Sequence, residues 1–375
     1  MKPGAYVHVP FCARRCAYCS FVALEGRSRE AEYFEAVERE IRARQGEIRG
    51  ALESVYFGGG TPSYVDADRL GRLLGTLEEI FGFSPDAEIT AEANPDDLTP
   101  ARISGLRSLG VNRLSVGVQS LVDAELLHLE RRHTAAAALS ALEAAVPLFG
   151  NVSADLMIGI PGQTRVSLRR SVENLLGTGI KHLSVYLLEI EKAPLLVRLK
   201  AGSPELFAGD EEMSDRWEMV DDLCTAAGLP RYEISSWARP LFESRHNLKY
   251  WTLEPVLGFG VAAHSFDGRR RTANAGSMAG YLRRTISGQT PRVLVEEETG
   301  DSLRRKERVM LGLRLAGGVT SSSFEETLGL LPGAEASRIR DAFEAGLLES
   351  ADEERRVRLT RRGVLLSNEV FELFL

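Results

Sequence analysis

Six short runs rich in apolar and β-branched residues recur through the first half of the chain. They cover residues 5–9, 54–57, 88–92, 113–118, 153–158 and 182–188. After these runs, apolar residues return every three or four positions, which is the spacing of a helix with one buried face. The first such stretch places on one face Tyr33, Phe34, Val37, Ile41 and Ile48. The pattern therefore predicts a repeated strand–helix unit.

Repeated strand–helix units predict a parallel sheet whose crossovers are right-handed. Six units fit an incomplete (β/α)6 barrel better than a closed eight-fold one, and we expect this α/β barrel to cover residues 1–235. The periodicity also fits a doubly wound open sheet. In a barrel, functional residues gather where the C-terminal ends of the strands meet the following loops.

The pattern changes in the last third of the chain. Residues 236–298 contain glycine, histidine and aromatic residues without clear periodicity, and we expect an irregular segment. Residues 299–375 read as a small, mostly helical domain with a hairpin around "ADEE" and a last helix capped by Thr360. This order resembles a winged helix. Because residues 301–375 hold 12 Lys and Arg against 13 Asp and Glu, packing or partner docking is favoured over DNA binding.

Charge and hydropathy exclude several classes of protein. The 375-residue chain has a net charge of −7 and a pI near 5.6, which argues against a broad nucleic-acid surface. No window approaches the roughly 18 consecutive apolar residues of a membrane span. The eleven residues before Cys12 contain no basic, apolar and small-residue succession of a secretory signal, so we expect a cytoplasmic protein.

Three of the four cysteines lie within eight residues, in "CARRCAYC". Cys12, Cys16 and Cys19 follow the first predicted strand, whereas Cys224 stands in a helical pattern where a small core side chain is expected. Three thiolates are one ligand short of closing a zinc or a cubane site. A [4Fe-4S] cluster held by three cysteines leaves one iron open for S-adenosylmethionine. Zinc ligation with His8 or His133, and three incidental thiols, are the alternatives.

Polar and glycine residues follow the other predicted strands. "YFGGGTPS" places three glycines after the second strand, where backbone can approach a ligand closely, and it lacks the spacing of a phosphate-binding or dinucleotide loop. Glu92 ends an otherwise apolar strand and needs a partner if buried. Each of these positions fits either ligand contact or a hydrogen bond within the fold; the same holds for Gln119, Arg131 and Asp155.

Together, "YVHVPFCARRCAYCSF", "YFGGGTPS", "AEANPDDL", "NRLSVGVQS", "ADLMIGIPGQT" and "SRHNLKYW" resemble the HemW family of heme chaperones. That family is related to oxygen-independent coproporphyrinogen III oxidase within the radical S-adenosylmethionine superfamily. The resemblance implies that Cys12, Cys16 and Cys19 ligate the cluster. It also implies S-adenosylmethionine contacts, with one or two molecules bound, at Tyr6, Gly59, Gly60, Thr61, Glu92, Gln119, Arg131 and Asp155.

Two features of the resemblance concern the substrate. The coproporphyrinogen decarboxylases carry a further cysteine where this chain has Phe21, and they have a longer segment before the cluster. The family's heme motif H-N-x-x-Y-W is complete here, and it implies heme contacts at His246, Tyr250 and Trp251. A histidine satisfied within the core is the competing interpretation of His246. One departure is "GFGVAAHS", in which Val261 and Ala262 replace the family's Pro and Gly.

The resemblance implies a carrier more than a catalyst. It would bind the cluster, S-adenosylmethionine and heme, accept an electron from a donor, and pass heme to hemoproteins such as respiratory-chain components. A radical enzyme acting on a tetrapyrrole, by decarboxylation or methyl transfer, is the second hypothesis. An inactive relative that serves as a protein-interaction scaffold is the third.

Overall fold

Six parallel strands in chain order form the centre of the molecule. The computed structural model describes residues 2–295 and 300–375. The six neighbouring strands are β1 (Gly4–Val9), β4 (Leu52–Gly59), β5 (Phe83–Ala93), β6 (Arg113–Gln119), β7 (Val152–Ile158) and β8 (His182–Leu187). A doubly wound sheet reverses its strand order at a switch point, and this sheet does not. The predicted incomplete (β/α)6 barrel is confirmed.

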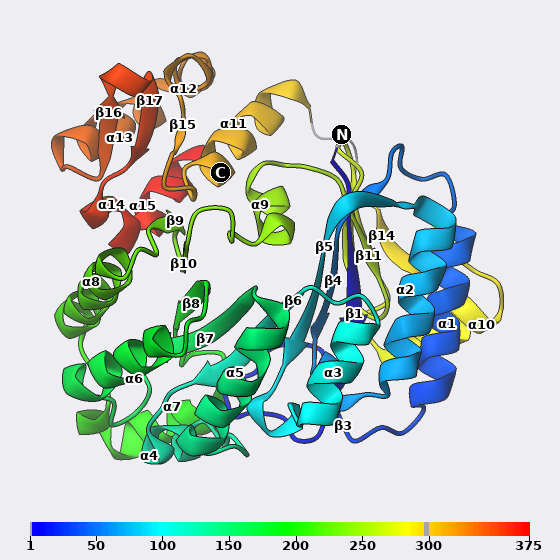
Figure 1. Ribbon diagram of the computed structural model, residues 1–375. Coiled ribbons are helices and arrows are strands. Elements are labelled where there is room, and N and C mark those ends of the chain that lie inside the picture. The colour runs from blue at the N-terminus through cyan, green and yellow to red at the C-terminus, as the bar shows by residue number, and fades with distance from the viewer. Residues whose placement is uncertain (1, 296–299) are drawn as a thin grey trace.

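A helix follows each of these strands. The six are α1 (Glu30–Ala43), α2 (Ala67–Phe81), α3 (Pro100–Ser108), α5 (Ala135–Phe149), α6 (Arg165–Gly177) and α8 (Asp210–Ala226). Helices α1 and α2 cover one side of β1, β4 and β5, and the short helix α9 (Arg245–Trp251) lies on the other side (Figure 1). Short elements in the loops are β2 (Phe11–Cys12), β3 (Leu24–Glu25), α4 (Asp123–His128) and α7 (Pro194–Gly202).

Residues 236–295 extend the sheet instead of forming irregular chain, and residues 296–298 of the predicted segment lie outside the described residues. Strand β11 (Val256–Phe259) pairs in parallel with β1, and antiparallel strands continue beyond it: β12 (His264–Phe266), β13 (Arg271–Asn274) and β14 (Arg292–Val295). The other edge carries β10 (Ser236–Ala238) and β9 (Arg231–Glu233). Strands of three or four residues are too short for alternation to be recognised in sequence, which explains the error. Helix α10 (Met278–Ile286) completes this segment.

The C-terminal region has the order of elements of a winged helix. It comprises α11 (Asp301–Gly312), β15 (Val319–Thr320), α12 (Ser321–Leu328), α13 (Gly333–Glu344), β16 (Leu348–Ala351), β17 (Arg356–Leu359), α14 (Arg361–Leu365) and α15 (Ser367–Phe371). Thr360 caps α14 as predicted, because its hydroxyl accepts a 2.9 Å hydrogen bond from the Gly363 amide. The domain docks on α8, where Arg361 pairs with Asp222 at 2.8 Å.

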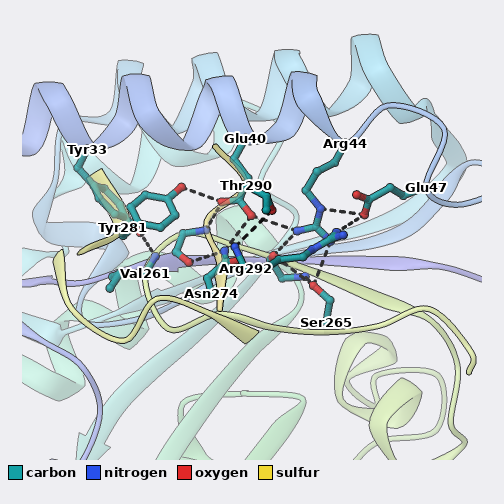
Figure 2. A network of polar contacts seen from close by, with 12 residues as sticks. Tyr33, Glu40, Arg44, Glu47, Val261, Ser265, Asn274, Tyr281, Thr290 and Arg292 are labelled. Carbon is teal, nitrogen blue, oxygen red and sulfur yellow. Dashed lines mark hydrogen bonds and ion pairs between the residues drawn. The ribbon is translucent and has the colours of Figure 1, made fainter. Parts of the chain in front are cut away.

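A buried polar network ties α1 to the strands that follow the barrel (Figure 2). The fully buried Glu40 carboxylate accepts hydrogen bonds from the Gly260 amide at 2.9 Å and the Asn274 amide group at 2.8 Å. It also accepts from the Tyr281 hydroxyl at 2.7 Å and pairs with Arg44 at 3.1 Å. Because a buried carboxylate is costly without such partners, the network fixes β11 and β13 against α1.

The hydrophobic core lies between the sheet and its covering helices. Along each barrel strand, apolar residues such as Val55, Leu114 and Leu183 face the helices and are fully buried. The same core continues into the C-terminal domain through Val309 and Phe374. Within the described residues, none of the helices combines the length and apolar character needed to cross a membrane.

Candidate functional site

The interior of the barrel is polar, which is unusual for this architecture. Side chains alternate along a strand, so the residues between the apolar core positions face the interior. TIM-type barrels normally fill this space with layers of Val, Ile and Leu. Here the inward positions are occupied by Tyr6, His8, Ser54, Tyr56, Glu88, Thr90, Glu92, Arg113, Ser115, Ser153, Asp155, His182 and Ser184. The interior is therefore built for a polar ligand or for catalysis.

A cavity of about 520 Å³ opens at the C-terminal ends of the strands. Ten of the residues selected from the sequence line it: Cys12, Cys16, Cys19, Gly59, Gly60, Thr61, Glu92, Gln119, Arg131 and Asp155. They come from five different strands and their loops, as expected for the functional end of a barrel. Tyr6 and the residues of the H-N-x-x-Y-W motif are not among the lining residues.

The cysteine loop leaves β1 at the edge of this cavity. The Thr61 hydroxyl donates to Cys12 Sγ at 3.5 Å, and the Arg131 guanidinium donates to Cys16 Sγ at 3.5 Å. Burial raises the pKa of Cys12 to about 11 and also raises that of Cys19. A coordinating metal holds such thiols as thiolates, and donors aimed at sulfur stabilise a thiolate-ligated cluster. The donor set thus fits a [4Fe-4S] cluster on three cysteines.

The structure argues against the zinc alternative at His8 but leaves one nitrogen of His133 without a partner. His8 uses Nε2 for the Val22 carbonyl at 2.8 Å and Nδ1 for the Tyr6 hydroxyl at 3.1 Å, so both ring nitrogens are occupied. His133 Nε2 bonds to the Val118 carbonyl at 3.0 Å, whereas its buried Nδ1 has no partner among the described residues. In the part of the chain that the structure describes, no three His, Cys, Asp or Glu side chains converge on one metal ion. Ligands at the corners of a multi-iron cluster have no need of such convergence.

The two arginines within the cysteine loop hold different partners. Arg14 pairs with Glu130 at 3.3 Å, and Arg15 donates to the Cys19 carbonyl at 3.0 Å. Both side chains line the cavity. Arg15 therefore supports the backbone of the loop at its third cysteine.

The glycine loop and Glu92 are locked together. The Glu92 carboxylate accepts from the Tyr56 hydroxyl at 2.9 Å and from the Gly59 amide at 3.0 Å. Gly59 has φ 109°, and a Cβ there would lie 2.3 Å from the His8 ring, so only glycine fits. Burial raises the pKa of Glu92 to about 7, although the Tyr56 hydrogen bond opposes the shift. The carboxyl therefore changes charge near neutral pH.

Arg131 and Asp155 also line the cavity. Arg131 donates to the Asn94 side chain at 2.6 Å and to the Gly117 carbonyl, and Ser115 donates to Asp155 at 3.3 Å. Burial raises the pKa of Asp155 to about 6. Asn94, which also donates to the Thr61 hydroxyl at 3.1 Å, was not predicted. Its position directly after the strand that ends at Ala93 is the signal that could have found it.

His246 lies deeper in the barrel and is saturated. Its Nδ1 is 2.9 Å from the Ser54 hydroxyl and its Nε2 is 3.1 Å from the Tyr250 hydroxyl, while only 1% of the residue is exposed. Burial, followed by the charges of Lys249 and Arg113, lowers the pKa of His246 to about 3. The imidazole is therefore neutral, as a metal ligand must be, but both nitrogens already have partners.

The two aromatic residues of the H-N-x-x-Y-W motif, Tyr250 and Trp251, contact different parts of the molecule. The Tyr250 ring meets His246 edge-on with centroids 5.4 Å apart, and Tyr250 is 42% exposed. Trp251 instead carries the Arg314 guanidinium over its ring at 4.3 Å, which ties α9 to the C-terminal domain. Tyr6 packs between these groups and the cavity, with its ring 6.4 Å from that of His246.

The "GFGVAAHS" segment still forms a turn, but with a strained backbone conformation at Ala262. Ala262 adopts φ 54°, the left-handed conformation that favours the glycine the family usually has here. The Val261 amide donates to the Tyr33 hydroxyl at 3.2 Å, which in turn donates to the His8 carbonyl at 2.6 Å. The substituted segment therefore still reaches the strand that bears the cluster loop.

Comparison with known proteins places the chain. Residues 6–175 match the radical SAM superfamily and residues 304–366 the HemN C-terminal domain. "Heme chaperone HemW" of Bacillus subtilis is 36% identical to this chain over 379 residues, and the match covers 99% of each chain. "Heme chaperone HemW" of Mycobacterium tuberculosis H37Rv is 35% identical over 380 residues, and the match covers 99% of this chain and 94% of the relative. Coproporphyrinogen III oxidase (HemN) from Escherichia coli shares the fold, with a TM-score of 0.85, 22% identity, and coverage of 100% of this chain and 90% of that one. The chain belongs to the HemW family of the radical S-adenosylmethionine superfamily.

Proposed function

We propose that this protein is a heme chaperone that carries a [4Fe-4S] cluster and S-adenosylmethionine and delivers heme to acceptor hemoproteins in the cytoplasm. The supporting observation is the single cavity in which three cysteines, the glycine loop, Glu92, Arg131 and Asp155 meet. The names of its near-full-length relatives support the heme assignment.

The residues around the cavity have separable roles in this proposal. Cys12, Cys16 and Cys19 hold the cluster, which when bound offers an open iron to the amino and carboxylate groups of S-adenosylmethionine. The glycine loop lets backbone approach the cofactor, and Glu92 accepts hydrogen bonds from its hydroxyl or ammonium groups. Arg131 donates toward Cys16 and so partly offsets the negative charge of the cluster.

Heme ligation by His246 requires a local rearrangement. Because Nε2 bonds to the Tyr250 hydroxyl, iron binding exchanges that hydrogen bond for a metal bond. Tyr250 stands at the surface end of this pair, so movement of its half-exposed ring opens the nitrogen. The other nitrogen keeps the Ser54 hydroxyl, which orients the ring as outer-sphere partners of metal-bound histidines do.

The test is anaerobic reconstitution with iron, sulfide, S-adenosylmethionine and heme, followed by absorption and electron paramagnetic resonance. Wild-type protein is expected to bind all three and to pass heme to an apo-hemoprotein. Replacing the three cysteines by alanine removes the cluster, and His246→Ala weakens heme binding. His264→Ala is the matched control because this exposed histidine lies outside the cavity. A His246→Ala protein that bound and delivered heme with unchanged affinity would remove the site assignment.

The complete cofactor cavity also supports a second function, radical chemistry on a tetrapyrrole. Reduced, cluster-loaded protein is then expected to release 5′-deoxyadenosine and a vinyl or methylated product when given a porphyrinogen and S-adenosylmethionine. Product formed over many turnovers would replace the chaperone proposal. Phe21, which lines the cavity and is 64% exposed, stands where the decarboxylases have their additional cysteine and weighs against this function.

A further inference from the structure

Among the described residues, the buried Arg113 has a guanidinium Nε–H without a hydrogen-bond partner. Arg113 opens β6, and only 1% of the residue is exposed. A buried donor without an acceptor is costly, so its retention needs an explanation.

The side chain points into the barrel beneath the cavity. Ser115 and Gly117 on the same strand line the cavity, and alternation puts Arg113 on the same face, two residues and about 6.6 Å deeper. Thr90 of β5 is its direct neighbour in the pairing register. The Thr90 hydroxyl is also fully buried and has no partner in the described ranges. Two unsatisfied hydrogen-bonding groups therefore lie side by side in one layer.

The inward-facing carboxyls near this layer are already engaged, including Glu88, which accepts from the backbone amides of Arg245 and His246. Glu92 accepts from Tyr56 and Gly59, and Asp155 accepts from Ser115. The charge of Arg113 lowers the pKa of both carboxyls, but neither forms a hydrogen bond with the Arg113 guanidinium among the described contacts.

The histidines that feel this charge are engaged as well, and their low pKa values leave them neutral. His182 bonds to Ser153 and Tyr232 at 2.8 Å each, and His246 bonds to Ser54 and Tyr250. Burial is the main cause of both low pKa values, and the charge of Arg113 adds to it. Polar groups surround the guanidinium, but in the part of the chain that the structure describes no carboxylate is hydrogen-bonded to it.

We propose that Arg113 and Thr90 form an internal carboxylate site that receives a propionate of the bound heme. This rests on the proposed heme function. A guanidinium offers parallel donors that match the two oxygens of a carboxylate, and a hydroxyl beside it adds a third donor. S-adenosylmethionine also has a carboxylate, but in the proposed arrangement that group would bind the open iron of the cluster. Heme brings two more carboxylates, and His246 borders the same interior as Arg113.

The experiment compares heme with heme dimethyl ester, in which both propionates are neutral. Reconstituted wild-type protein is expected to bind heme roughly tenfold to a hundredfold more tightly than the ester, the range for hydrogen bonds to a charged group. Arg113→Gln is expected to bring the two affinities within about threefold, and Thr90→Val to reduce the preference partially. Arg216→Gln is the matched control. Arg216 is as deeply buried and its Nε–H likewise has no partner among the described residues, but its guanidinium donates to the Gln163 carbonyl at 2.7 Å and pairs with Glu212, outside the barrel interior.

The outcomes separate this inference from the function it rests on. If wild-type protein binds heme and its ester equally, the carboxylate site is wrong and the chaperone proposal stands. If wild-type protein binds neither, both are wrong. A preference that survives in Arg113→Gln assigns propionate recognition to another cation and overturns the site. The wild-type comparison and Thr90→Val keep the test decisive even if Arg113→Gln does not fold.

Discussion

Replacing Glu40 is expected to produce one of the largest losses of stability available in this chain. Glu40→Ala removes the acceptor used by Gly260, Asn274 and Tyr281, and leaves Arg44 with a weaker set of partners (Figure 2). Breaking a buried ion pair costs about 3–5 kcal/mol, and each stranded donor adds about 1–3 kcal/mol, although such terms are not additive.

The expected loss is therefore at least about 4 kcal/mol, a large share of the roughly 5–15 kcal/mol that stabilises a typical domain. Glu40→Gln keeps one acceptor oxygen, and we expect about half that loss. Glu38→Gln is the control on the same helix. Glu38 pairs with Arg42 and Arg72 at the surface, where a salt bridge contributes roughly 0–1 kcal/mol.

Urea unfolding followed by far-ultraviolet circular dichroism measures the three variants against wild type. The slope of the transition is compared first, because an altered slope means that the two-state treatment no longer applies. A Glu40→Ala protein that unfolds within about 1 kcal/mol of Glu38→Gln would refute the reasoning. It would mean that the network is solvated or that its donors find other acceptors.

Three further predictions follow from the cavity and the strained turn. Gly59→Ala is expected to lower iron content after reconstitution, because its Cβ collides with the His8 ring; Gly162→Ala, with positive φ but open space, is expected to keep wild-type iron content. The stability of the cofactor-free protein is expected to fall by roughly 3 kcal/mol as pH rises from about 4.5 to 7, because folding raises the pKa of Glu92 and the unfolded chain loses that proton first. Thermal melts in Glu92→Gln should lack this share of the pH dependence, and an unchanged profile would assign it elsewhere. Ala262→Gly is expected to stabilise the protein by up to about 1 kcal/mol by relieving the left-handed alanine, as measured by urea unfolding, and a loss of stability would contradict the strain.

The barrel could be predicted because each of its strands carries a local signal. Apolar residues of β4 and β6 pack against helices, and their alternation can be recognised within a few consecutive residues. The pairing of β11 with β1 has no such signal, because Gly4 and Val256 are neighbours only in the folded sheet. Register between distant strands depends on the whole topology, so the strands within residues 236–295 could not be predicted from the local sequence.

The site shows the same division. The cysteine triplet (Cys12, Cys16 and Cys19) and the glycine loop could be recognised because each is a short contiguous motif. The structure brings both to one cavity. The contacts that they make with ligands stay predictions. The hydrogen bond between His246 and Ser54 could not be predicted, because Ser54 lies almost two hundred residues earlier in the chain. Arg113 was not predicted as a site residue. The alternation of polar and apolar residues along β6 puts Arg113 on the face opposite Leu114 and Val116, but only the apolar residues entered the strand prediction.

The late strand beside β1 has a consequence for the biogenesis of the protein. Strand β1 ends at Val9, directly before the cysteine loop, but its neighbour β11 begins only at Val256. At a synthesis rate of about 5–20 residues per second, one edge of β1 waits roughly 12 to 50 seconds for that neighbour. The loop therefore gains its mature support only after most of the chain has left the ribosome. During synthesis the cysteine loop therefore follows a strand with one unpaired edge, and it reaches its folded surroundings only when residue 256 and its neighbours are available.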